Sequence, residues 1–342
     1  MTTTARIGQD SPRTPRVRGS ERGPASPRYG RTTTQRVWSA RLLYLLLLPT
    51  LGLILVFSYT PILMGFYYSF TRYDGMHAFW IGPENYRRIF LDPALVQSYK
   101  NIAIILPFSL TVGVTMPLFV AYLIYHLKNA NLRYWFRVLF TVPMVVPGIV
   151  MLLIWIFMYT PVGGINTILN LIGLGGWTLT PEGVPRAWLG DQRTALGAIL
   201  FMGFPWVSPV NMLIFLAGLE AISVEMIDAA RVDGATGWKM FRHIELPMVM
   251  GQIRLIVVTG TIGVMQGFQN ILVLTRGGPG YSTMVPAMRM YDTVMPEGSL
   301  GVGSAPQMGF GSAIGVSLFV VIMVITLINL RVIRSVEPEV AR

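Results

Sequence analysis

Residues 228–247 read DAARVDGATGWKMFRHIELP, a compact charged segment between two long apolar stretches of the chain. The polar stretch begins at Glu220, and from there apolar and small residues recur at helical spacing as far as Asp233, with Ser223 placed to cap the N-terminus. Gly234 can take the left-handed backbone conformation and so ends this helix. The sequence therefore predicts a short helix followed by a sharp turn.

The second half of the segment predicts another helix, which leads directly into an apolar run. Trp238, Phe241, Ile244 and Leu246 give it an apolar side, and Pro247 suits the first turn of the following helix. Two small alanines beside a rigid turn, flanked by charges, are typical of an element that docks onto a partner protein. The alternative is an amphipathic connector that lies on a lipid surface.

The rest of the chain has the composition of a membrane protein. Of its 342 residues, 53% are hydrophobic and only 13% are charged, and the mean hydropathy is +0.55. Runs of about 20 apolar residues can cross a bilayer as helices. Short alternating segments that would indicate a membrane barrel are absent from the sequence. The fold class is therefore all-α, a polytopic membrane protein with six transmembrane helices near 42–70, 102–125, 135–160, 194–219, 248–274 and 309–332.

The two ends of the chain differ from this middle part. Residues 1–40 are rich in Arg, Pro, Ser, Thr and Gly, and predict a disordered basic tail. Nine arginines between Arg6 and Arg41 would also fit an arm that binds nucleic acid or anionic lipid, but a role in setting topology is favoured and no nucleic acid is expected. A long polar tail before a full-length apolar run does not resemble a secretory signal. The membrane domain is expected at 41–334, with a second short tail at 335–342.

The basic residues predict the orientation of the chain. If the N-terminus is cytoplasmic, 19 Lys and Arg residues lie on that side and 8 lie on the other. Because short cytoplasmic loops of membrane proteins carry an excess of positive charge, we expect both tails and the 220–247 loop to be cytoplasmic.

At this point the 220–247 loop shows a family resemblance. It resembles the EAA loop of binding-protein-dependent ABC importer permeases, in which Glu-Ala-Ala is followed at fixed spacings by Gly, Ile and Leu-Pro. The fuller string DAARVDGAT...F..IELP, with AWLGDQRTAL and IFLAGLEAIS before it and LTRGGPGYST after it, is similar to the carbohydrate-uptake branch and to its MalF-like subunit. The resemblance covers about residues 42–333. The sequence departs from the family at Asp228, where the motif has Glu, at Ser223, where proline is common, and at Arg276, where glycine is frequent.

The resemblance implies a type I ABC importer permease fold and a loop that couples a separate ATPase to the spans. It assigns the coupling role to Asp228, Ala229, Ala230, Asp233, Gly234, Ala235, Phe241, Ile244, Leu246 and Pro247. The charge pattern of the same helix adds Glu225, which could pair with polar groups of the partner. It also implies a second, MalG-like permease subunit, two ATPase subunits that bind ATP and Mg, an extracytoplasmic sugar-binding protein, and a location in a bacterial or archaeal cell membrane. None of the three lysines follows a P-loop pattern, so this chain itself is expected to hold no nucleotide or other cofactor.

Other functional classes need residues that this sequence lacks. An ion-driven carrier usually has carboxylates inside its spans, but none of the six apolar runs contains Asp or Glu. The chain has no cysteine, and its histidines, His77, His126 and His243, are scattered without metal-ligand spacing. We therefore expect a transport subunit with no metal site and no enzymatic activity of its own.

A polar solute would need neutral hydrogen-bonding groups inside the spans. The candidates for the substrate pathway are Trp206, Ser208, Asn211, Gln266, Gln269 and Asn270. Gln266 and Asn270 are four residues apart and would share one face of a helix. These amides would either contact sugar or bond to neighbouring helices, and Trp206 fits a packing role better than a stacking role.

Two glycine-rich segments are expected on the outer side of the membrane. Residues 161–193, with a short helix near 165–171, would form an interfacial connector or lie near the docked binding protein. Residues 277–280, GGPG, predict a tight turn rather than part of a gate. The resulting hypothesis is the permease subunit of an ATP-driven sugar importer. The alternatives are an ABC permease for another polar solute, such as a glycerophosphodiester, and a passive carrier or channel.

Overall fold

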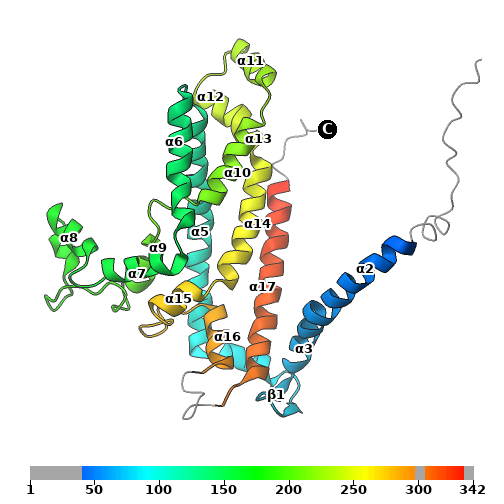
Figure 1. Ribbon diagram of the computed structural model, residues 1–342. Helices are drawn as coiled ribbons and strands as arrows, with labels where there is room; N and C mark the ends of the chain where they lie inside the picture. The colour runs from blue at the N-terminus through cyan, green and yellow to red at the C-terminus, as the bar shows by residue number, and fades with distance from the viewer. Residues whose placement is uncertain (1–40, 297–304, 335–342) are drawn as a thin grey trace, which may run out of the picture. The chain divides into compact units, whose positions relative to one another are not determined.

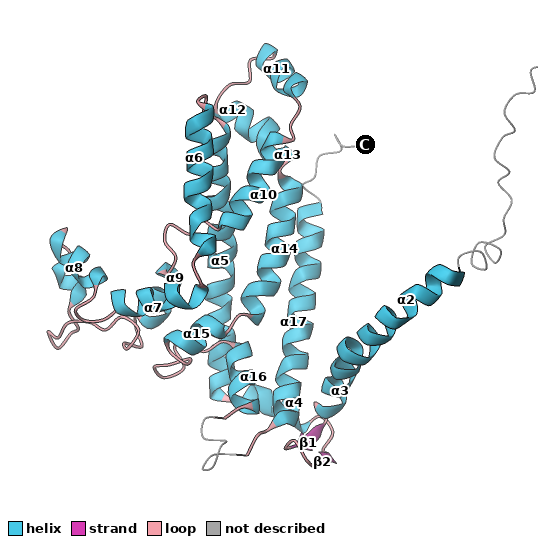
Figure 2. Ribbon diagram, viewed as in Figure 1, coloured by secondary structure: helices cyan, strands magenta, loops and turns pink. Residues whose placement is uncertain are grey.

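A computed structural model describes residues 41–296 and 305–334 of the chain. The predicted tails, 1–40 and 335–342, lie outside the described residues. The described part divides into two units, one ending at Thr60 and the other beginning at Pro61. Helices dominate both, as the all-α prediction requires (Figure 2). The first unit holds α2 (Arg41–Ile54) and a π-helical turn, η1 (Leu55–Tyr59), which continue into α3 (Thr60–Tyr68).

Three helical stretches of the described residues are long and apolar enough to cross a membrane. They are Tyr44–Tyr68, Pro93–Tyr125 and Met308–Val332. Three bent helix pairs bring the number to as many as six, namely Ala130–Val145 with Gly148–Met158, Pro209–Glu220 with Val224–Val232, and Trp238–Met248 with Met250–Gln266. The chain is thus a polytopic helical membrane protein, but half of its predicted spans are interrupted.

The second run begins earlier than predicted. Helix α5 (Pro93–Tyr125) is 33 residues long and starts nine residues before the expected Ile102. Asp92 caps it, because its carboxylate accepts a hydrogen bond from the backbone N–H of Leu95 at 2.9 Å, and Pro93 suits the first helical position. Sequence hydropathy missed this first part because it contains polar residues, among them Asn101.

The third and fourth runs are each divided into two helices. The third forms α6 (Ala130–Thr141), a 3₁₀ turn, η2 (Val142–Val145), and α7 (Gly148–Met158), with a bend of 89° at Pro147. The fourth forms α9 (Ala195–Phe201) and α10 (Pro209–Glu220), so the single helix predicted for 194–219 is wrong. Between them Gly203 and Trp206 have positive φ angles of 85° and 57°, which no α-helix can include.

The fifth run also ends early. Helix α14 (Met250–Gln266) stops before Gly267, whose φ and ψ of −70° and 120° are extended, and α15 (Gln269–Leu274) follows as a separate short helix. The predicted span 248–274 is therefore two helices. The chain then forms α16 (Pro286–Val294) and the long α17 (Met308–Arg334).

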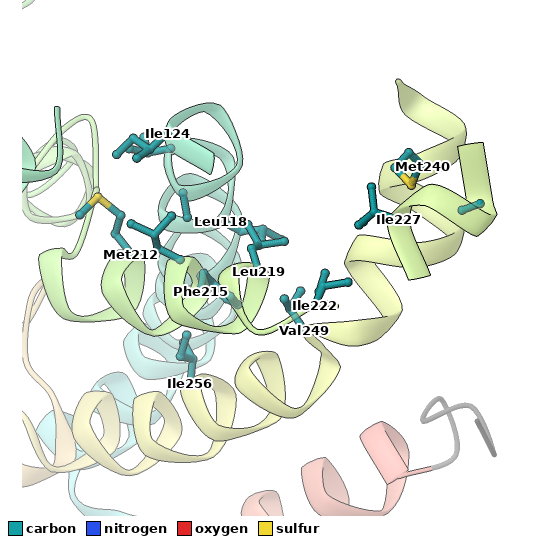
Figure 3. Close-up of a cluster of buried hydrophobic side chains, with 14 residues drawn as sticks. Leu118, Ile124, Met212, Phe215, Leu219, Ile222, Ile227, Met240, Val249 and Ile256 are labelled. Atoms are coloured by element: carbon teal, nitrogen blue, oxygen red, sulfur yellow. The ribbon is translucent and has the colours of Figure 1, made fainter. Parts of the chain in front are cut away.

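In the second unit, α5 packs against α10, α14 and α16, and α17 packs against α14 and α16 (Figure 1). One buried apolar cluster joins α5, α10 and α14 to the 220–247 loop (Figure 3). Phe215, Leu219 and Val249 are fully buried within it. A second cluster, around Met265, Met288 and Leu318, lies between α14, α16 and α17. Close packing of these helices fixes the base of the 220–247 loop.

A small antiparallel hairpin, β1 (Thr71–Tyr73) and β2 (Ala78–Trp80), follows α3 and pairs Thr71 with Trp80. The sequence did not predict it. Buried Asn85 of α4 (Glu84–Leu91) donates hydrogen bonds to the carbonyl oxygens of Ser69 and Thr71, which anchors the hairpin to that helix. The segment 161–193 contains the predicted short helix, α8 (Gly164–Leu171), and a 3₁₀ turn, η3 (Gly175–Thr178).

Candidate functional site: the 220–247 loop and a polar cavity

The first helix of the 220–247 loop is α11 (Val224–Val232), which lies at one end of the bundle (Figure 1). Ser223 caps it as predicted, since its hydroxyl oxygen accepts a hydrogen bond from the backbone N–H of Met226 at 3.3 Å. The helix ends in a Schellman motif: the N–H of Gly234 donates to the carbonyl of Arg231, and that of Ala235 donates to the carbonyl of Ala230. These bonds satisfy carbonyl groups that a helix end leaves free.

Gly234 has the left-handed conformation that the motif requires, with φ at +80°. No atom lies within 4 Å of the place where a Cβ would be, so backbone conformation alone selects glycine here. Gly237, with φ at +51°, makes a second sharp turn immediately before α12 (Trp238–Met240). Together the two turns lead the chain from α11 back to the bundle. The bend of 68° between α10 and α11 lies before them, at residues 221–223.

The faces of α11 differ sharply. Ile227 and Ala230 are buried in the apolar cluster, whereas Glu225, Asp228, Ala229 and Asp233 are exposed. Asp228 pairs with Arg231 at 3.0 Å on the exposed face. The structure therefore separates the two alanines that the motif treats together: Ala229 faces outward and Ala230 is part of the core.

The loop also exposes apolar side chains: Val224 and Val232 of α11, which the sequence analysis did not assign, and Trp238 of α12, which it expected on an apolar side. Val224 and Val232 expose 68% and 88% of their surfaces, and Trp238 exposes 68%. Val232 is the last residue of a short helix, where helical periodicity ends, which is why sequence alone missed it. Exposed apolar side chains among charges are typical of a surface that binds a protein.

The second helix of the loop runs without interruption from Trp238 to Met248, through a π-helical turn, η4 (Phe241–Glu245), and α13 (Leu246–Met248). Three of the four predicted apolar residues, Phe241, Ile244 and Leu246, pack against the buried cluster. Pro247 lies in α13, before the bend of 60° at which α14 begins. The second helix thus packs the loop against the bundle.

Where this helix approaches the end of α5, a polar cavity of about 460 Å³ opens. His126, Lys128, Arg133 and Arg231 contribute basic groups to its lining. Glu245 lines it too, and although its side chain is only 1% exposed, one of its oxygens lies 3.1 Å from Nε2 of His126. The sequence analysis assigned no role to either residue of this pair.

The predicted pathway residues do not form one group. Trp206, Gln269 and Asn270 line a cavity of about 350 Å³ between α5, α9 and α14, together with Phe108 and Ser109. Gln266 lines a different, apolar cavity. Because the helix breaks at Gly267, Gln266 and Asn270 do not share a helical face, and that prediction is wrong.

Two other pathway candidates have structural partners. Ser208 caps α10 by accepting from the N–H of Asn211, and the Asn211 amide donates to the carbonyl of Gly113 in α5 at 3.0 Å. The indole N–H of Trp206 donates to the carbonyl of Leu200. These bonds tie α10 and its preceding turn to their neighbours.

At the other end of α5, Asp92 accepts two hydrogen bonds from the guanidinium of Arg289 in α16, at 2.6 and 3.2 Å. Burial opposes ionisation of this carboxyl, but the bonds from Arg289 and Leu95 outweigh it and hold the pKa of Asp92 below its usual value. The nearby GGPG segment is a turn, as predicted, with positive φ at Gly277 and Gly280. Among the described residues no group of three His, Asp or Glu side chains could hold a metal ion.

The fold defines a class of protein, a polytopic helical membrane protein with a helical loop at one end of its bundle. Residues 113–341 match the family described as the binding-protein-dependent transport system inner membrane component. Because the match covers more than half of the chain, the chain belongs to that family, and it is the permease subunit of an ABC importer rather than an enzyme. Membership implies a partner permease, an ATPase and a solute-binding protein.

Relatives in this family match most of the chain. It is 31% identical over 307 residues to the sulfoquinovosyl glycerol transport system permease protein SmoG of Agrobacterium fabrum, covering 86% of this chain and 91% of that one. It is 29% identical over 306 residues to the trehalose/maltose transport system permease protein MalF of Thermococcus litoralis, covering 88% and 96%. The lactose permease protein LacF of Rhizobium radiobacter is 30% identical over 254 residues, covering 73% and 82%.

A solved structure has the same fold. A chain of a bacterial ABC transporter that imports the acidic polysaccharide alginate superimposes with a TM-score of 0.73 at 23% identity, covering 89% of this chain and 99% of that one. The same transporter has been solved in complex with its alginate pentasaccharide-bound periplasmic protein.

Proposed function

We propose that this chain is the sugar-translocating permease subunit of an ATP-driven importer in a bacterial or archaeal cell membrane. The proposal for sugar is supported by relatives whose names specify trehalose and maltose, lactose or sulfoquinovosyl glycerol. It pairs with a MalG-like permease over two ATPase subunits that bind ATP and Mg, and an extracytoplasmic binding protein delivers the sugar.

The observation that carries the coupling role is the geometry of the 220–247 loop. Its first helix presents acidic and apolar side chains outward, while Ile227, Ala230 and Met240 anchor the loop in the same cluster as α5 and α10 (Figure 3). A partner that moves the exposed face of α11 therefore moves the bundle with it, because packed helices transmit displacement rather than deform. The coupling residues named from the sequence act in two ways: the exposed ones contact the ATPase, and the buried ones pass on its motion.

In this proposal the loop and both chain ends are cytoplasmic, as the distribution of basic residues favours. The cavity lined by Trp206, Gln269 and Asn270 then lies along the route through the membrane. Its two amides and the hydroxyl of Ser109 offer donors and acceptors to sugar hydroxyls, and Phe108 and Trp206 offer aromatic surfaces. Alternating exposure of such a site to the two sides of the membrane would move the solute.

The test is uptake by cells that express the chain with its partner genes. Labelled maltose, trehalose, lactose and a glycerophosphodiester are supplied separately, with and without depletion of cellular ATP. ATP-dependent uptake of one of the sugars is expected. Preference for the glycerophosphodiester would replace sugar with another polar solute, and uptake that continues without ATP would indicate a passive carrier and contradict the proposal.

A further inference from the structure

Glu245 occupies an unusual position for a carboxylate. It lies in the π-helical turn η4, it is 99% buried, and its second oxygen has no hydrogen-bond partner among the described residues. Burying a charged group is costly unless it is paired, so a residue of this type in a packed loop needs its single partner. That partner is His126, the residue that ends α5.

The two ring nitrogens of His126 show which protons the pair holds. Nδ1 lies 3.0 Å from the carbonyl oxygen of Tyr122, which can only accept, so Nδ1 must carry a proton. Nε2 lies 3.1 Å from the Glu245 carboxyl group. A proton must also lie between Nε2 and that oxygen, on either atom, because otherwise two lone pairs would face each other. One shared proton therefore holds the pair together.

The pair joins two elements that the proposed function needs to move together. His126 ends α5, the same helix whose residues Phe108 and Ser109 line the candidate sugar cavity, roughly 25 Å away along the helix axis. Glu245 belongs to the second helix of the 220–247 loop. Beside it the rings of Tyr122 and Phe241 meet edge to face, with centroids 5.0 Å apart. The contact between loop and α5 thus has a polar and an apolar part.

Resting on the proposed function, we propose that His126 and Glu245 form a proton-held strut that carries the movement of the 220–247 loop into α5 and so to the sugar cavity. Both are positioning residues, since neither touches sugar or ATP. The strut weakens as pH rises and the shared proton leaves. The other titratable or charged groups around it are Tyr122 and Tyr125 on α5, Lys128 after it, Arg133 on α6, Arg231 on α11 and, near Tyr125, Glu220.

The test compares two substitutions of the same residue in the assembled complex. Glu245→Leu keeps the size of the side chain but removes the hydrogen bond. In Glu245→Gln, the amide donates to Nε2 of a neutral His126, so the strut persists without the shared proton. Uptake of the labelled sugar that the wild type transports best, and ATP hydrolysis, are measured from neutral to alkaline pH.

Glu245→Leu is expected to lower the sugar moved per ATP by roughly 5- to 150-fold, the usual range of coupling between sites, with the KM for sugar unchanged. Glu245→Gln should transport like the wild type at neutral pH and lose the decline at alkaline pH. If the leucine variant fails to assemble, His126→Phe takes its place. This substitution changes the half-exposed partner of the pair, removes the hydrogen bond, and keeps an aromatic ring beside Tyr122 and Tyr125.

Equal loss in the glutamine and leucine variants, or a leucine variant that moves as much sugar per ATP as the wild type, would overturn the strut. A fall in the amount of complex with an unchanged ratio of sugar to ATP would do the same, because it would show a role in folding alone. Failure of the proposed function is distinguishable, since the wild type would then show no ATP-dependent uptake at all.

Discussion

Single residues decide the shape of the 220–247 loop, and Gly234 does so through its backbone. At φ = +80° it is in a region where a side chain costs about 1–2 kcal/mol. Its N–H also donates to the carbonyl of Arg231, a bond that proline cannot make.

We predict that Gly234→Pro abolishes sugar uptake and transport-coupled ATP hydrolysis while membrane insertion stays intact. Gly234→Ala is the matched control and should be intermediate, because it keeps the N–H and meets no atom within 4 Å. Uptake and ATP hydrolysis are measured with equal amounts of inserted protein. Normal uptake by the proline variant would contradict a coupling role for this turn.

The candidate sugar cavity gives a second prediction at this scale. Asn270→Ala should raise the KM for sugar roughly tenfold, the effect of losing one hydrogen bond of about 1–1.5 kcal/mol, and should leave the amount of complex unchanged. Gln266→Ala is the control, since Gln266 lines the separate apolar cavity. Initial uptake rates over a range of sugar concentrations give the KM of each variant. Equal effects of the two substitutions on KM would show that this cavity is not part of the sugar pathway.

At the scale of elements, α11 should act as a docking helix whose exposed end contacts the ATPase. Val232 is 88% exposed at its last turn. We predict that Val232→Asp lowers the amount of ATPase that co-purifies, because it places a charge where an apolar side chain would be covered. Val184→Asp, at an exposed valine of the 161–193 segment, serves as the control and should leave co-purification unchanged. If Val232→Asp leaves the amount of co-purified ATPase unchanged, the ATPase does not bind at this end of α11.

The ion pair of Asp92 and Arg289 joins the start of α5 to α16. Because the pKa of Asp92 is lowered in the folded protein, its contribution to stability is complete above the unfolded pKa of about 3.9 and is lost as pH falls through the folded value. Asp92→Asn should therefore cost about 1–3 kcal/mol at neutral pH, and the difference from wild type should shrink in acid. Melting temperatures from pH 7 to about pH 3 measure this. A difference independent of pH would exclude the charge as its cause.

The elements also show where reasoning from sequence succeeded and failed. The cap at Ser223 and the turn at Gly234 depend on short-range chemistry, so the sequence predicted both correctly. Hydropathy located the apolar runs but not their breaks, because Gly203, Trp206 and Gly267 interrupt helices without changing the apolar character of the sequence. The His126–Glu245 pair links residues 119 positions apart, which no local pattern reveals.

For the whole molecule, the family match and the relatives establish an ABC importer permease, and the structure packs its 220–247 loop against the helix bundle. The proposed importer moves solute only when the exposed face of α11 and the buried cluster behind it act as one body. A docked ATPase must therefore lie against Ala229 and not against the neighbouring Ala230, which is buried. This difference between adjacent residues allows a direct test.

Because the chain has no native cysteine, a single introduced cysteine is its only site for a thiol-specific cross-linker. Ala229→Cys is expressed with the partner genes and treated in membranes with a thiol-to-amine cross-linker, and adducts are identified by mass spectrometry. Ala230→Cys is the matched control. The account predicts an adduct between residue 229 and a P-loop ATPase, and little or none from residue 230. If the thiol at residue 229 is labelled but repeatedly gives no ATPase adduct, α11 is a surface connector and the coupling account is wrong.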